Sequence, residues 1–271
     1  MSKKSGDTSR RTFIKKIGVM TGGAYIAGTL LPSMDADASA LQDDDLNTEF
    51  ITYPSGDLSM KAFMAYPKKG KKFPAVIVIH ENRGLVPHIQ DVTRRMAREG
   101  FLAIAPDALS PVGGTPEDVS NVGEKFKQLV PEETTKNFVA AVKYLKTNPL
   151  TNGKVGCTGF CWGGAMTNQV AVNAPDLNAA VPYYGRPPAS EDVEKIKAPV
   201  MAHFAGEDAG INAGIPAFED ALKKYGKEYQ FFIYEGAQHA FNNDSNPQRY
   251  NAEAAKLAWG RTIGFFREKL K

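Results

Sequence analysis

The stretch Gly159-Phe160-Cys161-Trp162-Gly163-Gly164 decides the fold of this chain of 271 residues. It follows a short apolar run, residues 154–158, and precedes a helical pattern over residues 165–172. Glycines on both sides of Cys161 give the strand and the helix room to pass in a very tight turn. The first N–H groups of a helix and its dipole favour negative charge, so the turn suits a thiolate at its apex. The sequence therefore predicts a strand, a sharp turn bearing a nucleophilic thiol, and a helix.

Strands and helices alternate on both sides of this turn. Phe73–His80 is a continuous apolar run, typical of a strand buried on both faces. The expected strands cover residues 49–53, 59–66, 73–80, 101–105, 154–158, 179–184, 200–204 and 229–234. The expected helices cover residues 88–99, 116–129, 132–147, 165–172, 215–225 and 248–270. The pattern predicts an α/β fold, one domain over residues 49–271 with a mostly parallel central sheet and helices on both faces.

Chemistry-bearing residues follow the expected strands at their carboxyl ends, where such sheets bind ligands. Glu81 and Asn82 follow the strand ending at His80, and Cys161 follows the strand expected over residues 154–158. Asp208 stands in Gly206-Glu207-Asp208, and His239 stands in the segment from Gly236 to Phe241. The order nucleophile, acid, histidine fits a triad in which Cys161 attacks an acyl carbon, His239 shuttles the proton and Asp208 holds the imidazole.

These motifs together resemble the dienelactone hydrolase family of the α/β-hydrolase superfamily. The resemblance is carried by Glu81, the Gly159–Gly164 elbow, the Ala105-Pro106-Asp107 turn, and the acid and histidine segments, and it runs from about residue 50 onward. It implies a Cys161–Asp208–His239 triad with a glutamate, Glu81, beside the thiol. It also implies an oxyanion hole made by the backbone N–H groups of Asn82 and Trp162, each donor worth on the order of 3 kcal/mol. The implied activity is hydrolysis of small esters or lactones through a thioacyl-enzyme, of the carboxymethylenebutenolidase type.

Glu81 has a physical reading of its own. A carboxylate next to a thiol favours the neutral thiol, which protects it from oxidation at rest. In the family, substrate binding is proposed to rearrange this contact so that the carboxylate takes the thiol proton. We expect Glu81→Gln to lose turnover and keep the fold.

One departure limits the substrate assignment. The family typically carries an arginine shortly after the phenylalanine of the histidine segment, where it binds the substrate carboxylate. Here the stretch is Phe241-Asn242-Asn243-Asp244, without a cation, and Arg83 and Arg186 are candidates to replace it. Ester or lactone hydrolysis is therefore better supported than hydrolysis of a dienelactone itself.

Residues 1–40 have the features of an export signal. Ser9-Arg10-Arg11-Thr12-Phe13 resembles the twin-arginine signal of bacteria, and it is followed by an apolar, glycine-containing run and by Ala38-Ser39-Ala40. We expect a cleaved signal, a polar linker over residues 41–48, the twin-arginine export machinery as a partner, and a periplasmic or secreted mature protein without stable membrane association. The alternative is a disordered basic tail or an uncleaved anchor.

Composition excludes several other classes of function. The net charge is +3, and residues 41–271 carry equal numbers of basic and acidic side chains, which gives no indication of a nucleic-acid partner.

The four histidines show no metal-binding spacing, so we expect no metal and no cofactor, and His80, His88 and His203 are assigned structural roles. Cys157 and Cys161 are too far apart for a disulfide, and Cys157 is expected in the core. The alternative function is a binding or thiol-redox protein on a hydrolase scaffold.

Overall fold

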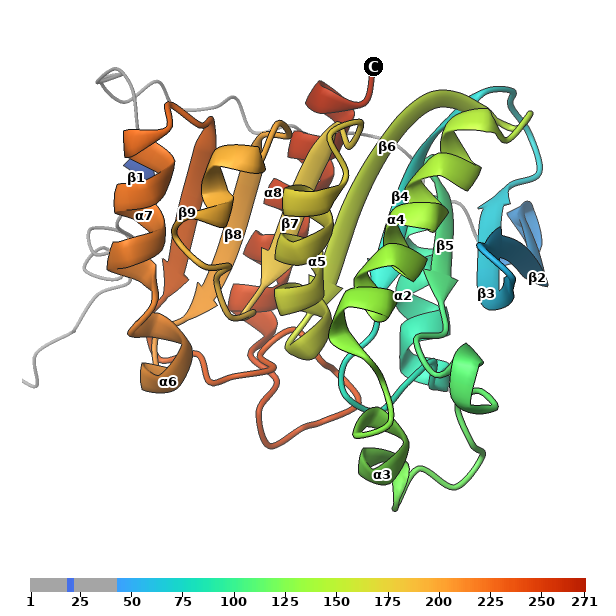
Figure 1. Ribbon diagram of the computed structural model, residues 1–271, viewed down its shortest axis with the longest axis horizontal. Coiled ribbons are helices and arrows are strands. Elements are labelled where there is room, and N and C mark those ends of the chain that lie inside the picture. The colour runs from blue at the N-terminus through green and yellow to red at the C-terminus, as the bar shows by residue number, and fades with distance from the viewer. Residues whose placement is uncertain (1–18, 22–42) are drawn as a thin grey trace, which may run out of the picture.

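A nine-stranded sheet runs through the molecule in the order β1-β9-β8-β7-β6-β4-β5-β3-β2 (Figure 1). The computed structural model describes residues 19–21 and 43–271. Neighbouring strands from β5 through β4, β6, β7 and β8 to β9 are parallel, whereas β1, β2 and β3 run antiparallel to their neighbours. The strands are β1 Val19–Thr21, β2 Leu46–Ser55, β3 Leu58–Pro67, β4 Phe73–Ile79, β5 Leu102–Pro106, β6 Thr151–Phe160, β7 Ala179–Tyr183, β8 Val200–Ala205 and β9 Tyr229–Tyr234.

Helices cover both faces of this sheet, as the alternating sequence pattern predicts. The α-helices are α2 Pro87–Arg98, α3 Val122–Phe126, α4 Pro131–Thr147, α5 Trp162–Asn173, α6 Ala209–Asn212, α7 Ile215–Lys224 and α8 Ala252–Lys269. Short 3-10 turns lie at η1 Asp43–Asp45, η2 Ser110–Val112 and η3 Asp192–Lys195. In Figure 1, α4, α5 and α7 lie in front of the sheet, and α2 and α8 lie behind it.

The core consists of two apolar layers separated by the sheet. Along β4, Ile77 and Ile79 belong to the layer with α4, α5 and α7, and Val76 and Val78 belong to the layer with α2 and α8. All four side chains are fully buried, which is why the strand reads as a continuous apolar run. The α/β fold with a mostly parallel sheet and helices on both faces is confirmed.

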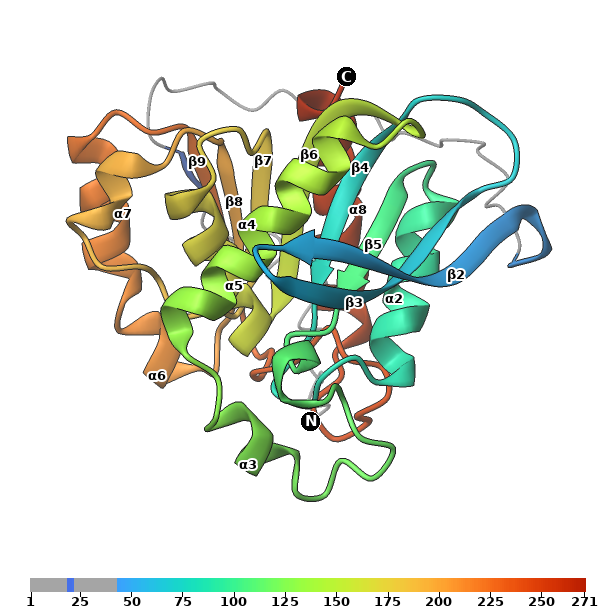
Figure 2. The ribbon, with the colours of Figure 1, turned by 45° about the vertical axis from the view of Figure 1, so that its right-hand side comes forward.

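The edge hairpin β2–β3 lies in front of β5 when the molecule is turned (Figure 2). Its ten Cα pairs run from Leu46 opposite Pro67 to Ser55 opposite Leu58. The Tyr53 hydroxyl donates to the Asn137 carbonyl of α4 over 3.1 Å, which fastens the hairpin to the helix layer. The end of the segment expected to be a polar linker, residues 41–48, is therefore part of the sheet, because Leu46 is buried and pairs with Pro67.

The prediction of a helix over residues 116–129 is wrong. Only α3, Val122–Phe126, is helical there, and the preceding segment is a loop held by hydrogen bonds to a buried carboxylate: Thr115 N–H donates to Asp107 Oδ2 over 2.7 Å. The last helix begins at Ala252 and not at residue 248, because the Asn251 side chain accepts the Ala254 N–H and ends the preceding loop.

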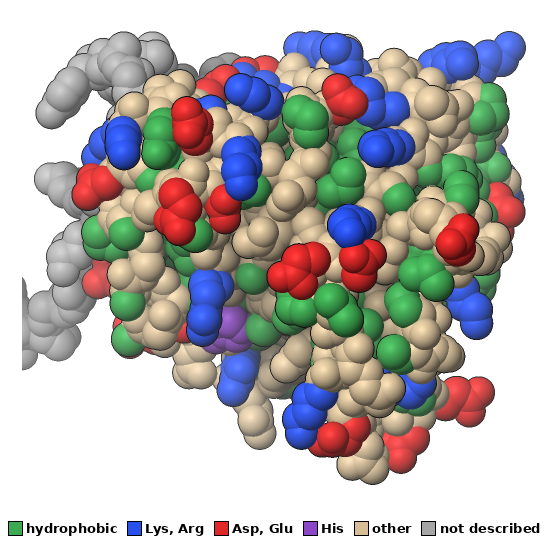
Figure 3. All heavy atoms as spheres, in the orientation of Figure 1, with side chains coloured by type: hydrophobic (Ala, Val, Ile, Leu, Met, Phe, Trp, Pro, Cys, Tyr) green, Lys and Arg blue, Asp and Glu red, His purple; other side chains and the backbone are tan. Residues whose placement is uncertain are grey.

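The predicted export signal lies outside the described residues, except for Val19–Thr21. The backbone of these three residues pairs with β9, with Val19 opposite Phe232. Within the described part of the chain, no helix is both long enough and apolar enough to cross a membrane. Figure 3 shows acidic and basic side chains interspersed over the face of the molecule seen in Figure 1.

Candidate active site

Cys161 lies at the apex of the turn between β6 and α5, in a backbone conformation that side chains rarely adopt. Its φ is 56° and its ψ is −115°. Glycine is required on both sides, because a Cβ on Gly159 would lie 2.3 Å from the Gly163 carbonyl oxygen. A Cβ on Gly163 would lie 2.4 Å from the carbonyl oxygens of Ile79 and His80. The strained turn therefore presses the start of α5 against the end of β4 and leaves the thiol partly exposed.

His239 lies between the thiol and a carboxylate. Its Nδ1 is 2.5 Å from Asp208 Oδ2, and Cys161 lies close enough to the ring to affect its pKa. The contact with Cys161, followed by that with Asp208, raises the pKa of His239 to about 9 against the opposing effect of burial. At neutral pH the imidazole therefore carries a positive charge next to the Cys161 sulfur.

Asp208 is held by the turn after β8. It is the N-cap of α6, where its Oδ1 accepts the Ile211 N–H over 3.4 Å while Oδ2 faces His239. The neighbouring Glu207 N–H donates to the Ala237 carbonyl over 2.9 Å. The loops carrying the acid and the histidine are thus tied to each other, and the structure brings together all three residues of the predicted triad.

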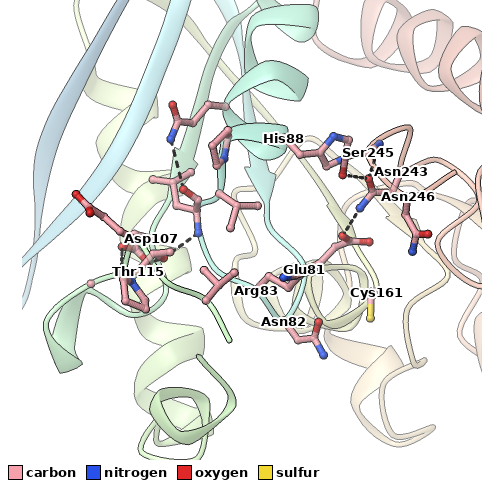
Figure 4. Close-up of a pocket in the computed structure, with 18 of the residues that line it drawn as sticks. Glu81, Asn82, Arg83, His88, Asp107, Thr115, Cys161, Asn243, Ser245 and Asn246 are labelled. Atoms are coloured by element: carbon pink, nitrogen blue, oxygen red, sulfur yellow. Dashed lines mark hydrogen bonds between the residues drawn. The ribbon is translucent and has the colours of Figure 1, made fainter. Parts of the chain in front are cut away.

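Glu81 lies in the same site, with its carboxylate held by an amide. Asn243 Nδ2 donates to Glu81 Oε2 over 2.7 Å (Figure 4). The oxygen of the same amide, Oδ1, accepts from the Ser245 N–H and hydroxyl, at 3.0 and 2.6 Å. Ser245 therefore fixes the orientation of the Asn243 amide, so that its NH₂ group points at the carboxylate. Nothing in the sequence pattern indicated this contact beyond the absence of a cation after Phe241.

The predicted oxyanion donors lie on the two segments that meet at this turn. Trp162 opens α5, and the first N–H groups of a helix have no partner within it. The Asn82 N–H donates to no acceptor within the described residues. The indole of Trp162 packs inward on the His80 ring, with centroids 5.5 Å apart and planes 12° apart. The indole therefore packs against the apolar layer of α4 and α5.

A cavity of about 1920 Å³ opens over Cys161 and His239. Glu81, Asn82 and Arg83 line it near the thiol, and Phe50 of the edge hairpin lines another part of its wall. Arg186, the other cation considered as a substitute for the missing arginine, is not among the lining residues.

A buried carboxylate holds the loops beside this cavity. Asp107 accepts the Leu109 N–H, the Thr115 N–H and the Thr115 hydroxyl over 3.0, 2.7 and 2.8 Å. The Thr115 hydroxyl oxygen in turn accepts the Leu85 N–H over 2.8 Å. Asp107 therefore connects the loop after β5 to the loop that carries Glu81 and Asn82, a role that the sequence pattern did not indicate.

The remaining histidines and the second cysteine lie outside the triad. His203 is buried against Tyr234 and Thr262, and His88 faces Asp244 at 3.3 Å. Cys157 is a free, buried thiol whose pKa is raised to about 12 by burial. No cluster of three or more His, Cys, Asp or Glu side chains suited to a metal ion occurs in residues 43–271.

The strand order, the elbow and the strand-end residues define an α/β-hydrolase fold. Within that class the chain belongs to the dienelactone hydrolase family, whose profile matches residues 60–270. It is accordingly a hydrolase.

Known relatives agree with this assignment. A protein of Saccharolobus solfataricus named "Putative carboxymethylenebutenolidase" is 33% identical over 259 residues, covering 82% of this chain and 98% of the relative. A protein of the same name from Escherichia coli K12 is 31% identical over 242 residues, covering 83% and 89%. The crystal structure of a "Putative Dienelactone Hydrolase" from Klebsiella pneumoniae superposes with a TM-score of 0.75 at 28% identity, covering 82% of this chain and 98% of that one.

Proposed function

We propose that this protein hydrolyses carboxylic esters or lactones through a thioacyl-enzyme formed on Cys161. The observation that carries the proposal is the position of His239, which is hydrogen-bonded to Asp208 and lines the same cavity as Cys161, close enough to the thiol for Cys161 to raise its pKa. The sulfur attacks the carbonyl carbon and the imidazolium gives its proton to the departing alkoxide. The neutral imidazole then takes a proton from water, which attacks the thioester and releases the acid and the thiol. Asp208 holds the ring and stabilises its charged form.

The negative oxygen of the tetrahedral intermediate is assigned to the N–H groups of Asn82 and Trp162. Both belong to segments that meet at the elbow, where Gly163 allows α5 to touch the end of β4. Preorganised donors of this kind are typically worth about 10²- to 10³-fold in kcat each.

Glu81 is assigned to proton control at the thiol. Its carboxylate lines the cavity together with Cys161, and Asn243 holds it by one oxygen. That geometry leaves the second oxygen available to the thiol or to water. Glu81→Gln should keep the fold and lower turnover; wild-type turnover in this variant would remove Glu81 from the mechanism.

The substrate class proposed is an ester or lactone without a strict need for a bound carboxylate. The segment after Phe241 offers Asn243 where the family typically has a cation, and Asn243 is already engaged by Glu81. The name carboxymethylenebutenolidase, carried by the relatives, is consistent with lactone hydrolysis.

The decisive test is hydrolysis of p-nitrophenyl acetate and a panel of small lactones by wild type, Cys161→Ala and Cys157→Ala. We expect Cys161→Ala or prior treatment with iodoacetamide to lower kcat by about 10³-fold or more. Cys157→Ala should retain activity because that thiol lies in the core. An alkylated Cys161 with no hydrolysis by the untreated protein would instead favour the thiol-redox or binding alternative.

We also propose that residues 1–40 direct twin-arginine export to the periplasm or beyond. The support is the Ser9–Phe13 motif and the apolar run that follows it. Replacing Arg10 and Arg11 by lysine should leave the protein in the cytoplasmic fraction; unchanged fractionation of this variant would contradict the proposal.

A further inference from the structure

His80 makes two hydrogen bonds that fix its tautomer. The Ala108 N–H donates to His80 Nε2 over 3.1 Å, so Nε2 carries a lone pair. His80 Nδ1 lies 2.6 Å from the Glu81 carbonyl oxygen, to which it must then donate. The ring is fully buried and stacks on Trp162, and burial lowers the pKa of His80, which keeps it neutral. The imidazole therefore presents one fixed N–H to one fixed carbonyl.

That carbonyl belongs to the peptide group whose other end is the Asn82 N–H. The two ends of a planar trans peptide point in opposite directions, so fixing the Glu81 C=O also fixes the direction of the Asn82 N–H. A hydrogen bond accepted by the carbonyl polarises the amide and makes its N–H a stronger donor. The Gly84 N–H adds a second, longer bond to the same oxygen, at 3.3 Å.

We propose that His80 is a positioning residue, which orients and polarises the Glu81–Asn82 peptide as an oxyanion donor. The chain of bonds runs from the Ala108 N–H through the imidazole to the Glu81 carbonyl, and across the peptide to Asn82. His80 does not touch the substrate, because its ring is enclosed by Trp162 and Phe126. The catalytic part of this inference rests on the proposed function, whereas the state of the peptide does not.

A matched pair of variants separates the two bonds of His80. In His80→Asn the side-chain NH₂ lies near the position of Nδ1 and can still donate to the Glu81 carbonyl. In His80→Gln the amide lies near the position of Nε2, where it can accept the Ala108 N–H but cannot reach the carbonyl. We expect His80→Gln to lower kcat for ester hydrolysis by about 10-fold or more, with KM within about 3-fold, and His80→Asn to stay within about 3-fold of wild type.

Alkylation of Cys161 by iodoacetamide is the control, because it forms no oxyanion. Its rate should stay within about 2-fold of wild type in both variants while kcat separates them. The inference is overturned if His80→Gln is as active as His80→Asn, or if alkylation falls in step with kcat, since the loss would then be a general disturbance of the site.

A second measurement is independent of activity. In the ¹⁵N spectrum of the full chain, His80 should carry its proton on Nδ1, and the Asn82 amide should shift in His80→Gln far more than in His80→Asn. A proton on Nε2, or an unmoved Asn82 amide, would overturn the inference. If wild type hydrolyses no ester, the proposed function fails, while these shifts still decide whether His80 sets the state of the peptide.

Discussion

Asn243 gives the Glu81 carboxylate a neutral partner. It donates to Glu81 at 2.7 Å with a neutral amide, so this contact brings no positive charge to the carboxylate. An arginine here would neutralise the carboxylate and compete with the thiol for it. The neutral amide therefore leaves the carboxylate without a competing cation at this contact.

Asn243→Asp should make this dependence measurable. Two carboxylates at hydrogen-bond distance cannot both ionise freely, so one retains a proton to higher pH. Near pH 8, where both carboxylates are ionised and the site carries one more negative charge, we expect kcat/KM to fall by about 10-fold. It should recover partly at lower pH, where the two carboxylates share a proton. The measurement is the pH profile of ester hydrolysis.

Gln248→Glu is the matched control for that variant. Gln248 is exposed and lines the same cavity, so the substitution adds a similar charge away from Glu81. An equal loss in both variants would mean that the effect is a general one of charge in the cavity.

The sequence indicates the nucleophile, acid and histidine because each follows a strand in a short motif. Cys161, Asp208, His239 and Glu81 can be named for that reason, and the structure brings them together. The partners of these residues could not be predicted in the same way. Asn243 reaches Glu81 across 162 residues of sequence, and His80 was assigned a structural role because nothing in its sequence neighbours shows which groups its ring bonds.

The elbow between β6 and α5 has no space for the methyl group that alanine would add at Gly159. The Cβ would lie 2.3 Å from backbone, which cannot move without displacing α5. We expect Gly159→Ala to lower the free energy of unfolding by about 3 kcal/mol or more, measured by urea denaturation.

Gly260→Ala is the opposite case and serves as its control. Gly260 is exposed in α8, with no atom within 4 Å of an added Cβ. Alanine should therefore raise the free energy of unfolding by about 1 kcal/mol, through better helix propensity. A similar destabilisation in both variants would show that the close approach at the elbow is not the cause.

The loop between β5 and α3 depends on a hydroxyl. Thr115 donates to Asp107 and accepts from Leu85, so Thr115→Val leaves the buried Leu85 N–H without its partner and removes one of three hydrogen bonds to Asp107. We expect a loss of about 1–3 kcal/mol of unfolding free energy. Thr115→Ser keeps the hydroxyl and should recover most of it; equal losses in the two variants would point to packing.

This loop also shows the limit of the sequence pattern. Residues 116–129 have helix-forming composition, yet only five residues are helical. The hydrogen bonds from Thr115 to Asp107, eight residues earlier in the sequence, hold the backbone at the entry to this segment. Local periodicity contains no information about such a partner, whereas it predicts the long buried strands and helices well.

Protonation of His239 couples the active site to the free energy of unfolding of the protein. Its pKa is raised to about 9 in the folded protein, above the ordinary value of 6.5 expected after unfolding. The folded state therefore binds the proton more tightly, and this contribution is fully present below about pH 6.5 and lost as the pH rises through about 9.

Urea unfolding of wild type and His239→Gln between pH 6 and pH 10 tests this coupling. The difference in unfolding free energy between them should shrink as the pH rises. In a Cys161→Ala background most of the pH dependence should disappear, because the contact with Cys161 is the largest cause of the raised pKa. A gap that stays constant or widens with pH would contradict the assignment.

The two cysteines of the chain are four residues apart and differ in access. Cys161 is partly exposed at the apex of the elbow, and Cys157 is fully buried in β6 with its sulfur 3.8 Å from the Thr167 hydroxyl. A thiol reagent should therefore consume one equivalent per native chain and two after unfolding. Under the proposed mechanism the first equivalent counts competent active sites, so a preparation can be standardised by its thiol titre before any substrate is known.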